Sequence, residues 1–213
     1  MLVKDRMTPN PITITPDTTF PDAFRIIREK GIRYLPVVNK RGKLIGIVTQ
    51  TDLLHASPSS ATTLSVFEVN YLLARLTVEE VMRTPITVPE DAPIESAARV
   101  MVENGISCLP VMRDGDLVGI ITETDIFKAF QEILGSGENV LRITLRMPDV
   151  PGELARMTGV IADLGGNLHS VAAFYGADRE YVYITFRLDG VDQEVLLPAL
   201  EEMGEQVVHV CCI

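Results

Sequence analysis

The segments GIVTQTDLL (residues 46–54) and GIITETDIF (residues 119–127) decide the fold, because each reads as a strand running into a helix and the two are identical at five of nine positions. They belong to a longer internal repeat. Residues 11–37 match residues 85–111 at 12 of 27 positions, and residues 42–52 match residues 115–125 at 7 of 11. Unrelated segments share about one residue in fifteen to twenty. The first two thirds of the chain therefore contain two copies of one structural unit.

Each copy predicts a helix in its first half. Asp17 or Thr18 in the first copy, and Asp91 in the second, can cap the amino end of this helix. Pro21 and Pro93 suit a first helical turn, where the missing N–H costs little.

The second half of each copy predicts two strands and a further helix. Gly31 and Gly105 are expected to end the first helix with positive φ. A second helix is expected to begin near Asp52 and near Asp125. The predicted strands cover residues 34–38, 44–49, 108–112 and 117–122. Preceded by an extended stretch at residues 12–14 or 86–88, each copy reads β-α-β-β-α, and one copy is too small to bury both faces of its sheet, so the two should pack together.

The repeated strand-to-helix turn offers a chemistry for binding nucleotides. Free N–H groups at a helix start attract phosphate. The hydroxyl of Thr49 or Thr122 can bond phosphate or sugar, and the carboxylate of Asp52 or Asp125 can accept the two hydroxyls of a ribose. The alternative is that each aspartate only caps its helix.

Residues 1–135 resemble a tandem cystathionine-β-synthase (CBS) pair, or Bateman module. The resemblance rests on GIRYLPVV followed by GKLIGIVTQTDLL, and on GISCLPVM followed by GDLVGIITETDIF. It implies binding of AMP, ADP, ATP or a related adenosyl ligand. The family motif falls on Thr49, Thr51 and Asp52, and on Thr122, Thr124 and Asp125. It also implies that the start of each repeat completes the other site, which places Thr84, Pro85, Ile86 and Thr87 near Asp52, and Pro11, Ile12 and Thr13 near Asp125.

Charge separates the two repeats. The net charge is −10, which disfavours a nucleic-acid partner. Lys30 and Arg33 precede the Leu-Pro pair in the first repeat, whereas Asn104 and Ser107 hold these places in the second. We therefore expect the Asp52 site to be the stronger anion site, and the Asp125 site to be weaker or to need Mg²⁺ with the nucleotide. The alternative for Lys30 and Arg33 is simple solvent exposure.

The last third has a different pattern. Residues 140–147 alternate as a half-buried strand, and a helix should open within residues 149–154, with Pro151 near its first position and Leu154 on its apolar stripe. Strands over 167–175 and 181–188, a helix over 192–203 and a strand over 206–212 complete a ferredoxin-like βαββαβ order. The predicted fold class is α+β, with domains at 1–66 (repeat one with an exposed, mobile link at 55–66), 67–137 (a linking helix and repeat two) and 138–213.

Most of residues 139–213 resemble an ACT domain, through the D-x-P-G-x-L loop and Gly-Gly-Asn-Leu. The resemblance implies pairing of ACT domains side by side, and an amino-acid site on Asp149, Val150, Pro151, Gly152, Glu153, Leu154, Asn167 and Leu168. The alternative is that the loop only makes a turn and the domain only dimerises.

The whole chain resembles the AcuB-type acetoin-utilisation proteins, and we expect a regulatory, allosteric nucleotide sensor without catalytic activity. No catalytic motif is present, and the three histidines are scattered. We expect a cytoplasmic homodimer with small-molecule ligands, an unidentified regulated protein, no resident metal, and no nucleic-acid or membrane partner. The alternatives are an assembly module with degenerate sites and an adenosyl-dependent enzyme.

Overall fold

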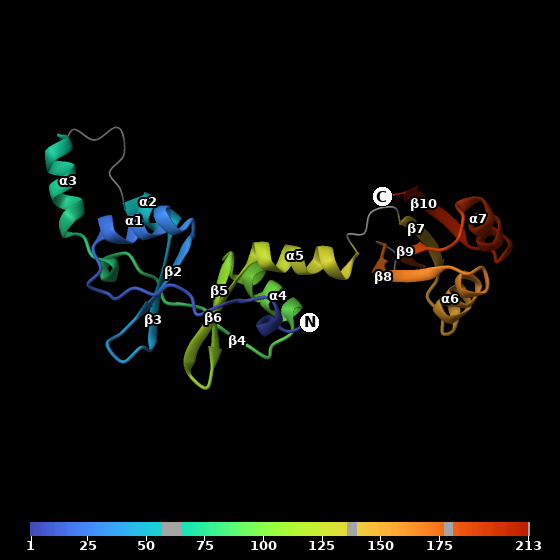
Figure 1. The fold of residues 1–213 in the computed structure, drawn as a ribbon, viewed down its shortest axis with the longest axis horizontal. Coiled ribbons are helices and arrows are strands. Elements are labelled where there is room, and N and C mark those ends of the chain that lie inside the picture. Colours follow the sequence, from blue (N-terminus) through green and yellow to red (C-terminus); the bar gives the residue numbers. More distant parts are fainter. Residues whose placement is uncertain (57–64, 136–139, 177–180, 213) are drawn as a thin grey trace. The chain divides into compact units, whose positions relative to one another are not determined.

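The computed structural model describes residues 1–56, 65–135, 140–176 and 181–212. The chain divides into two compact units, Met1–Phe127 and Lys128–Ile213, and each is described by itself (Figure 1). This division falls inside the helix α5 (Glu123–Ile133). Within the second unit, the Ser170 hydroxyl donates a hydrogen bond to the carbonyl of Leu134 at 2.7 Å.

The first unit holds both repeats, in the order that the sequence predicts. Repeat one contains η1 (Val3–Asp5), β1 (Thr8–Pro9), α1 (Phe20–Lys30), β2 (Tyr34–Val38), β3 (Leu44–Thr49) and α2 (Gln50–Ala56). After α3 (Val66–Arg75), repeat two contains η2 (Val78–Glu80), β4 (Val88–Pro89), α4 (Ile94–Asn104), β5 (Cys108–Arg113), β6 (Asp116–Thr122) and α5. Gly31 and Gly105 end α1 and α4, both with φ of 62°.

The amino-terminal caps differ from the prediction. Thr19 caps α1, and its Oγ1 accepts a hydrogen bond from the Asp22 amide at 3.3 Å. Pro93 stands at the cap position of α4, so Asp91 does not cap it. Both helices instead receive help from distant backbone, because the first amide of α1 donates to Leu76 O at 2.8 Å and that of α4 donates to Met1 O at 3.2 Å.

The two repeats exchange their leading segments. Strand β1, which belongs to repeat one in sequence, pairs with β6 of repeat two, so the sheet order is β1-β6-β5-β4. Reciprocally, Arg83 at the start of repeat two forms a bridge with Ile47 in β3. Thr8 pairs with Ile120. Because Ile47 and Ile120 are equivalent in the repeat, Arg83 and Thr8 occupy equivalent places.

The signature glycines make this exchange possible. A Cβ added at Gly46 would lie 2.5 Å from the sulfur of Met82, and a Cβ at Gly119 would collide with the sulfur of Met7. Each methionine comes from the segment that crosses to the other repeat. Between the repeats, Ile47, Cys108 and Ile120 form a small apolar cluster.

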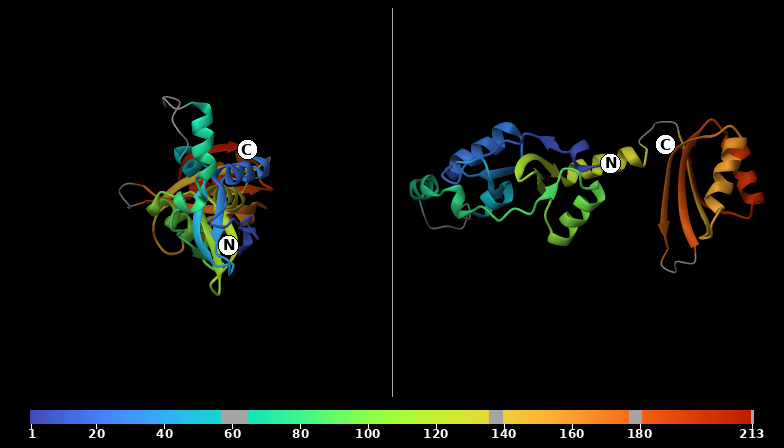
Figure 2. Two further views of the ribbon diagram at one scale, coloured as in Figure 1. Left: turned by 90° about the vertical axis from the view of Figure 1, so that its left-hand side faces the viewer. Right: turned by 90° about the horizontal axis from the view of Figure 1, so that it is seen from below.

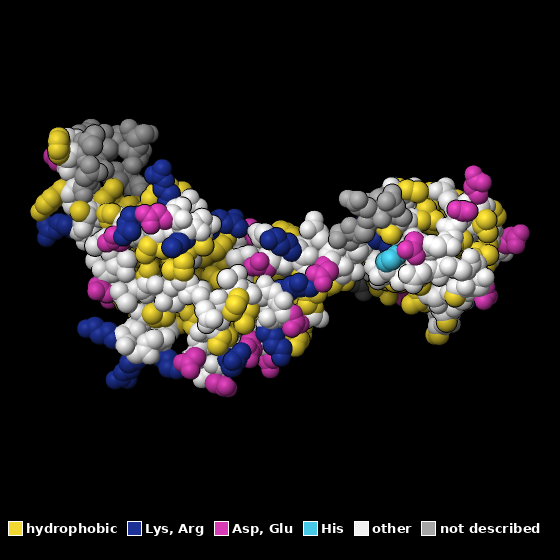
Figure 3. All heavy atoms as spheres, in the orientation of Figure 1, with side chains coloured by type: hydrophobic (Ala, Val, Ile, Leu, Met, Phe, Trp, Pro, Cys, Tyr) yellow, Lys and Arg dark blue, Asp and Glu magenta, His cyan; other side chains and the backbone are white. Residues whose placement is uncertain are grey.

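The predicted link at 55–66 lies mostly outside the described residues. His55 and Ala56, however, belong to α2, and Ser65 caps α3 in a capping box with Glu68. The expected helix at 67–76 is therefore present one residue earlier. Its side chains Phe67, Tyr71 and Leu72 are exposed, at 88%, 61% and 52%, and hydrophobic spheres gather over α3 in Figure 3.

The second unit has the predicted βαββαβ order. It consists of β7 (Leu141–Pro148), α6 (Glu153–Asp163), β8 (Asn167–Tyr175), β9 (Tyr181–Asp189), α7 (Gln193–Glu202) and β10 (Gln206–Cys212). The sheet order is β10-β7-β9-β8, and both helices lie against one of its faces (Figure 2). Met157 and Ile161 of α6 are buried, whereas Leu154, in the first turn of the helix, is 46% exposed. Gly152, rather than Pro151, precedes α6.

Within the part of the chain that the structure describes, no helix is both long and apolar enough to cross a membrane.

Candidate functional site

Two cavities of similar size lie at equivalent places of the repeat pair. The Asp52 pocket, of about 340 Å³, is lined by the end of β3 and the start of α2, together with residues from repeat two. The Asp125 pocket, of about 350 Å³, is lined by the end of β6 and the start of α5, together with residues from repeat one. Each pocket therefore combines a strand-to-helix turn of one repeat with segments of the other.

The Thr-x-Thr-Asp turns are built as capping boxes. Asp52 Oδ2 accepts hydrogen bonds from the Thr49 amide at 3.0 Å and the Thr49 hydroxyl at 2.8 Å, while the Asp52 amide donates to the Thr49 hydroxyl at 3.1 Å. Asp125 makes the same contacts to Thr122, at 2.9 Å, 2.7 Å and 3.4 Å. The helices therefore begin at Gln50 and Glu123, and each aspartate is the third helical residue rather than the cap.

This arrangement reconciles the two interpretations of the aspartates. One carboxylate oxygen closes the helix start, and the other, Oδ1, is directed elsewhere. Asp52 is buried, with 6% of its surface exposed, and it lines its cavity. A carboxylate oxygen has two lone pairs, so Oδ1 can still accept hydrogen bonds from a ligand.

The crossing segments supply walls for both pockets. Thr84 and Ile86 line the Asp52 pocket, and Asn10, Pro11 and Ile12 line the Asp125 pocket. Ile86 and Ile12 keep 38% and 40% of their surface exposed, which leaves an apolar wall available to a planar ring. Thr51 and Thr124 also line their respective pockets, whereas Thr13, Pro85 and Thr87 line neither.

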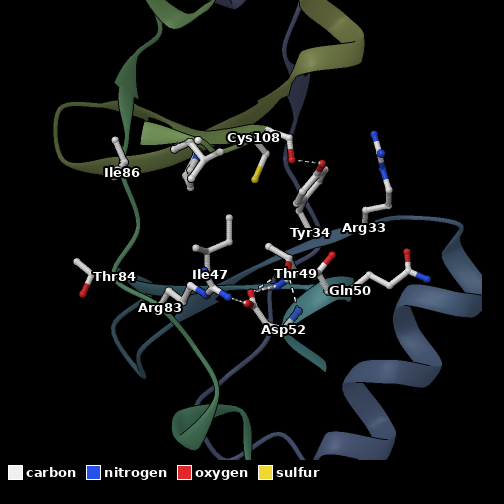
Figure 4. A pocket seen from close by; sticks show the side chains of 15 residues that line it. Arg33, Tyr34, Ile47, Thr49, Gln50, Asp52, Arg83, Thr84, Ile86 and Cys108 are labelled. Carbon is white, nitrogen blue, oxygen red and sulfur yellow. Dashed lines mark hydrogen bonds and ion pairs between the residues drawn. The ribbon is translucent and has the colours of Figure 1, made fainter. Parts of the chain in front are cut away.

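Arg83 brings a positive charge to the Asp52 pocket. It was not among the site residues predicted from the sequence. Its guanidinium forms an ion pair with Asp52 Oδ1 (Figure 4). The Arg83 side chain is 70% exposed and that of Asp52 only 4%. The resemblance to CBS pairs implied that the start of repeat two lies near Asp52, and this could have drawn attention to residues 82–84. Only the pairing register of this segment with β3 reveals that Arg83 is the residue that reaches the Asp52 carboxylate.

Arg33 lines both pockets. Its Nη2 donates to the Thr124 hydroxyl at 3.3 Å, in the turn of the Asp125 pocket, although the residue also lines the Asp52 pocket. Its guanidinium packs over the Tyr34 ring at 5.4 Å. Lys30 is exposed and lines neither pocket. The reason is again the exchange: the segment after α1 faces the turn of the other repeat.

The residues equivalent to Arg33 and Tyr34 stand on the Asp52 side. Ser107 and Cys108 line the Asp52 pocket, and the Ser107 hydroxyl lies 2.8 Å from the Tyr34 hydroxyl (Figure 4). Burial raises the pKa of the Cys108 thiol to about 12, with Arg33 opposing the shift. This thiol therefore remains protonated near neutral pH and contributes apolar surface.

Among residues 1–56, 65–135, 140–176 and 181–212, no three His, Cys, Asp or Glu side chains are grouped as metal ligands would be.

The predicted amino-acid site of the second unit is not assembled within one chain. Asp149–Leu154 follows the end of β7, where Pro148 pairs with Tyr181. Asn167 and Leu168 begin β8 at the opposite end of the sheet, where Leu168 and Leu141 both pair with Leu188. The seven residue steps from Leu141 to Pro148 separate the two groups by about 23 Å. The loop itself is exposed.

Comparison with known families agrees with this architecture. The CBS-domain model matches residues 3–59 and 78–132, and a model described as a TTHA0829-like ACT domain matches residues 139–211. The chain belongs to the CBS-domain family. Its first unit is a CBS pair, and an ACT-like domain follows.

Three solved structures are similar to the CBS pair. The CBS pair of protein MJ0100, in complex with 5′-methylthioadenosine and S-adenosyl-L-methionine, is 34% identical, with a TM-score of 0.51 over 61% of this chain and 95% of that one. A putative acetoin utilization protein (AcuB) from Vibrio cholerae is 36% identical, with a TM-score of 0.51 over 61% and 90%. CBSX2 in complex with AMP is 31% identical, with a TM-score of 0.52 over 62% and 97%.

A curated relative carries the pair as a minor part of a longer protein. L-aspartate semialdehyde sulfurtransferase of Methanocaldococcus jannaschii is 34% identical over 131 residues, which are 61% of this chain but only 23% of the relative. The likeness therefore concerns the CBS pair.

Proposed function

We propose that this chain is a non-catalytic regulatory sensor whose CBS pair binds an adenine nucleotide or a related adenosyl ligand. In each pocket the apolar wall, Ile86 or Ile12, would hold the base. The remaining oxygen of Asp52 or Asp125 would accept the ribose hydroxyls. The phosphate would lie at the start of α2 or α5, where the amides of the first helical turn point outward.

The observation that carries the proposal is the duplicated pocket. Both cavities combine a Thr-x-Thr-Asp turn with an apolar residue from the opposite repeat, at equivalent positions. A turn needed only for helix capping has no requirement for such a wall. The related CBS pairs found with S-adenosyl-L-methionine, 5′-methylthioadenosine and AMP support the same ligand class.

Regulation would follow from the position of the ligand between the repeats. A ligand that touches both halves of a pocket favours the arrangement in which those halves fit it best. Such coupling has a typical size of ~1–3 kcal/mol. The ACT-like domain and an unidentified protein partner would receive the signal.

The test is a thermal-shift panel with AMP, ADP, ATP, S-adenosylmethionine, NAD and amino acids, each with and without Mg²⁺. Ligand at about 100 times its dissociation constant stabilises the fold by ~2.7 kcal/mol. We expect a shift from at least one adenosyl compound, reduced in Asp52→Ala or Asp125→Ala. The variant Lys30→Ala, outside both pockets, is the matched control. No shift from any adenosyl compound would support an assembly module instead.

Catalysis is tested with the same preparation. Nucleotide recovered intact and in stoichiometric amount after incubation would support the sensor. Turnover of ATP or S-adenosylmethionine would support the alternative of an adenosyl-dependent enzyme. The protonated, buried state of the Cys108 thiol argues against its use as a nucleophile in the Asp52 pocket.

For the ACT-like domain we propose homodimerisation. Strand β8 forms one edge of the sheet, and it carries exposed Val171 and Phe174, at 43% and 51%. An edge of this kind favours pairing with another strand. Light scattering of the purified chain should give a dimer, and Val171→Lys should weaken it, whereas Val195→Lys on exposed α7 should not.

The free thiols Cys108, Cys211 and Cys212 support the cytoplasm as the location.

A further inference from the structure

The two pockets differ at one place that controls access to the ribose-binding carboxylate. Asp52 Oδ2 already accepts two hydrogen bonds, from the amide and hydroxyl of Thr49. A carboxylate oxygen offers about two acceptor positions, so Oδ2 is saturated. Oδ1 has two positions, and Arg83 holds one of them. A ribose that donates both hydroxyls to Asp52 must therefore displace Arg83.

The Asp125 pocket has no such obstacle. Asp125 Oδ2 is saturated in the same way by Thr122. The place equivalent to Arg83 is held by Thr8, which pairs with Ile120 as Arg83 bridges to Ile47. Among the described residues no salt bridge involves Asp125. Both acceptor positions of its Oδ1 are therefore available to a ribose.

Displacing Arg83 leaves two groups that need new partners. Asp52 is buried and receives the ribose hydroxyls, which are neutral donors. The guanidinium of Arg83 loses its anion. A phosphate in the same pocket would restore a charged partner, since guanidinium and phosphate form paired, charge-assisted hydrogen bonds. A neutral adenosyl ligand has no anionic group to pair with the Arg83 guanidinium.

Arg83 is free to make this transfer. Its side chain is 70% exposed, and it lies in the segment that leads to the pocket residues Thr84 and Ile86 (Figure 4). Arg33, which lines both pockets, differs in kind, because its hydrogen bond at the Asp125 pocket is to the neutral hydroxyl of Thr124. Binding at the Asp125 pocket therefore breaks no ion pair.

We propose that Arg83 determines ligand selectivity in the Asp52 pocket: it occupies Asp52 when the pocket is empty and moves to the phosphate when a nucleotide binds. The Asp52 pocket then selects adenosine phosphates over neutral adenosyl compounds, and the Asp125 pocket, in which no ion pair must be broken, selects less strongly. This inference rests on the proposed function, because it assumes that the ligand is an adenosyl compound whose ribose binds Asp52.

The test measures AMP and adenosine affinities by calorimetry at the Asp52 pocket alone. The Asp125 pocket is silenced in two independent backgrounds, Asp125→Ala and Ile12→Trp, so that failure of one to fold leaves the other. In either background, Arg83→Thr copies the residue of the other repeat. We expect AMP to bind about tenfold more weakly, the equivalent of ~1.4 kcal/mol. Adenosine should bind about two- to fivefold more tightly, because the ion pair between Arg83 and Asp52 no longer has to be broken.

Two further variants sharpen the interpretation. Arg83→Lys keeps the charge without the planar fork and should retain part of the preference for AMP. Thr8→Arg, in an Asp52→Ala background, should strengthen the preference for AMP at the Asp125 pocket. If Arg83→Thr changed the affinities for AMP and adenosine by the same factor, or changed neither, this inference would be overturned and the proposed function would stand. A wild-type protein that binds neither compound would overturn the proposed function together with it.

Discussion

Arg83 and Asp52 form an ion pair that joins the two repeats, because the arginine belongs to the crossing segment of repeat two and the aspartate to helix α2 of repeat one. The same carboxylate closes the amino end of α2 through its other oxygen. Asp125 makes only the second kind of contact. The pair therefore has a structural role in addition to its proposed role in selectivity.

The first prediction compares the two aspartates in stability. Asp125→Ala removes a capping contact, with an expected loss of about 1 kcal/mol. Asp52→Ala removes the same contact and the link to Arg83, which adds up to about 1 kcal/mol for a partly exposed pair. Urea unfolding followed by circular dichroism measures both values. Thr51→Ala, which removes no hydrogen bond of the capping box, should change stability little, and equal losses for the two aspartates would contradict the prediction.

A second prediction concerns the signature glycines. Gly46→Ala should destabilise the first unit by about 1–3 kcal/mol, because the new methyl group meets the sulfur of Met82. The double variant Gly46→Ala/Met82→Ala shortens the side chain that the new methyl group meets. It should therefore lose less unfolding free energy than the sum of the losses in the two single variants. Gly159→Ala is the control: its methyl group would meet nothing within 4 Å, and it should gain about 0.5–1 kcal/mol of helix stability. Strict additivity at Gly46 and Met82 would count against the clash.

A third prediction separates Arg33 from Lys30. In an Asp52→Ala background, Arg33→Ala should weaken AMP binding at the Asp125 pocket by roughly tenfold, because it removes the guanidinium that lies 3.3 Å from Thr124. Lys30→Ala should leave the affinity unchanged. Calorimetry gives both numbers. If Arg33→Ala acted only on the Asp52 pocket, the assignment made from the sequence would be right and this one wrong.

A fourth prediction is a pH dependence in the ACT-like unit. Burial raises the pKa of the Glu205 carboxyl from its ordinary 4.5, while Arg156, at 2.6 Å, opposes the shift and Glu153 shares the same guanidinium. Its Oε2 is buried, and no described residue forms a hydrogen bond with it. With a raised pKa, the folded state holds the proton more tightly than the unfolded state. The contribution of Glu205 to the free energy of unfolding is therefore greatest below pH of about 4.5, and it is lost as the pH rises through the raised pKa.

The measurement is the difference in unfolding free energy between Glu205→Gln and wild type as a function of pH. Glutamine keeps the shape and cannot ionise, so the variant should gain relative stability as the pH rises above about 4.5. Taking the difference cancels the other carboxylates that titrate in the same range. A difference that does not change with pH would show that Glu205 keeps an ordinary pKa.

The sequence by itself determined the elements. The repeat, the turn glycines and the alternation of apolar residues predicted strands β2, β3 and β10 at their observed bounds, because these signals are local to the backbone that they shape. The Thr-x-Thr-Asp turns could also be located, since a capping box needs only residues three apart. The cap position of Pro93 was missed because backbone from Met1 satisfies the first amide of α4. The cap at Thr19 was missed although its contact to the Asp22 amide is local.

Only the tertiary structure decided which charge serves which pocket. Arg33 is close to the Leu-Pro pair of its own repeat in sequence, yet it reaches Thr124, while Arg83, distant in sequence from Asp52, pairs with it. The exchange of leading segments between the repeats causes both results, and strand register fixes them to a single residue. Register also separates Asp149 from Asn167 at opposite ends of one sheet. A linear motif contains no information about register, because register is set by the packing of side chains from two distant segments.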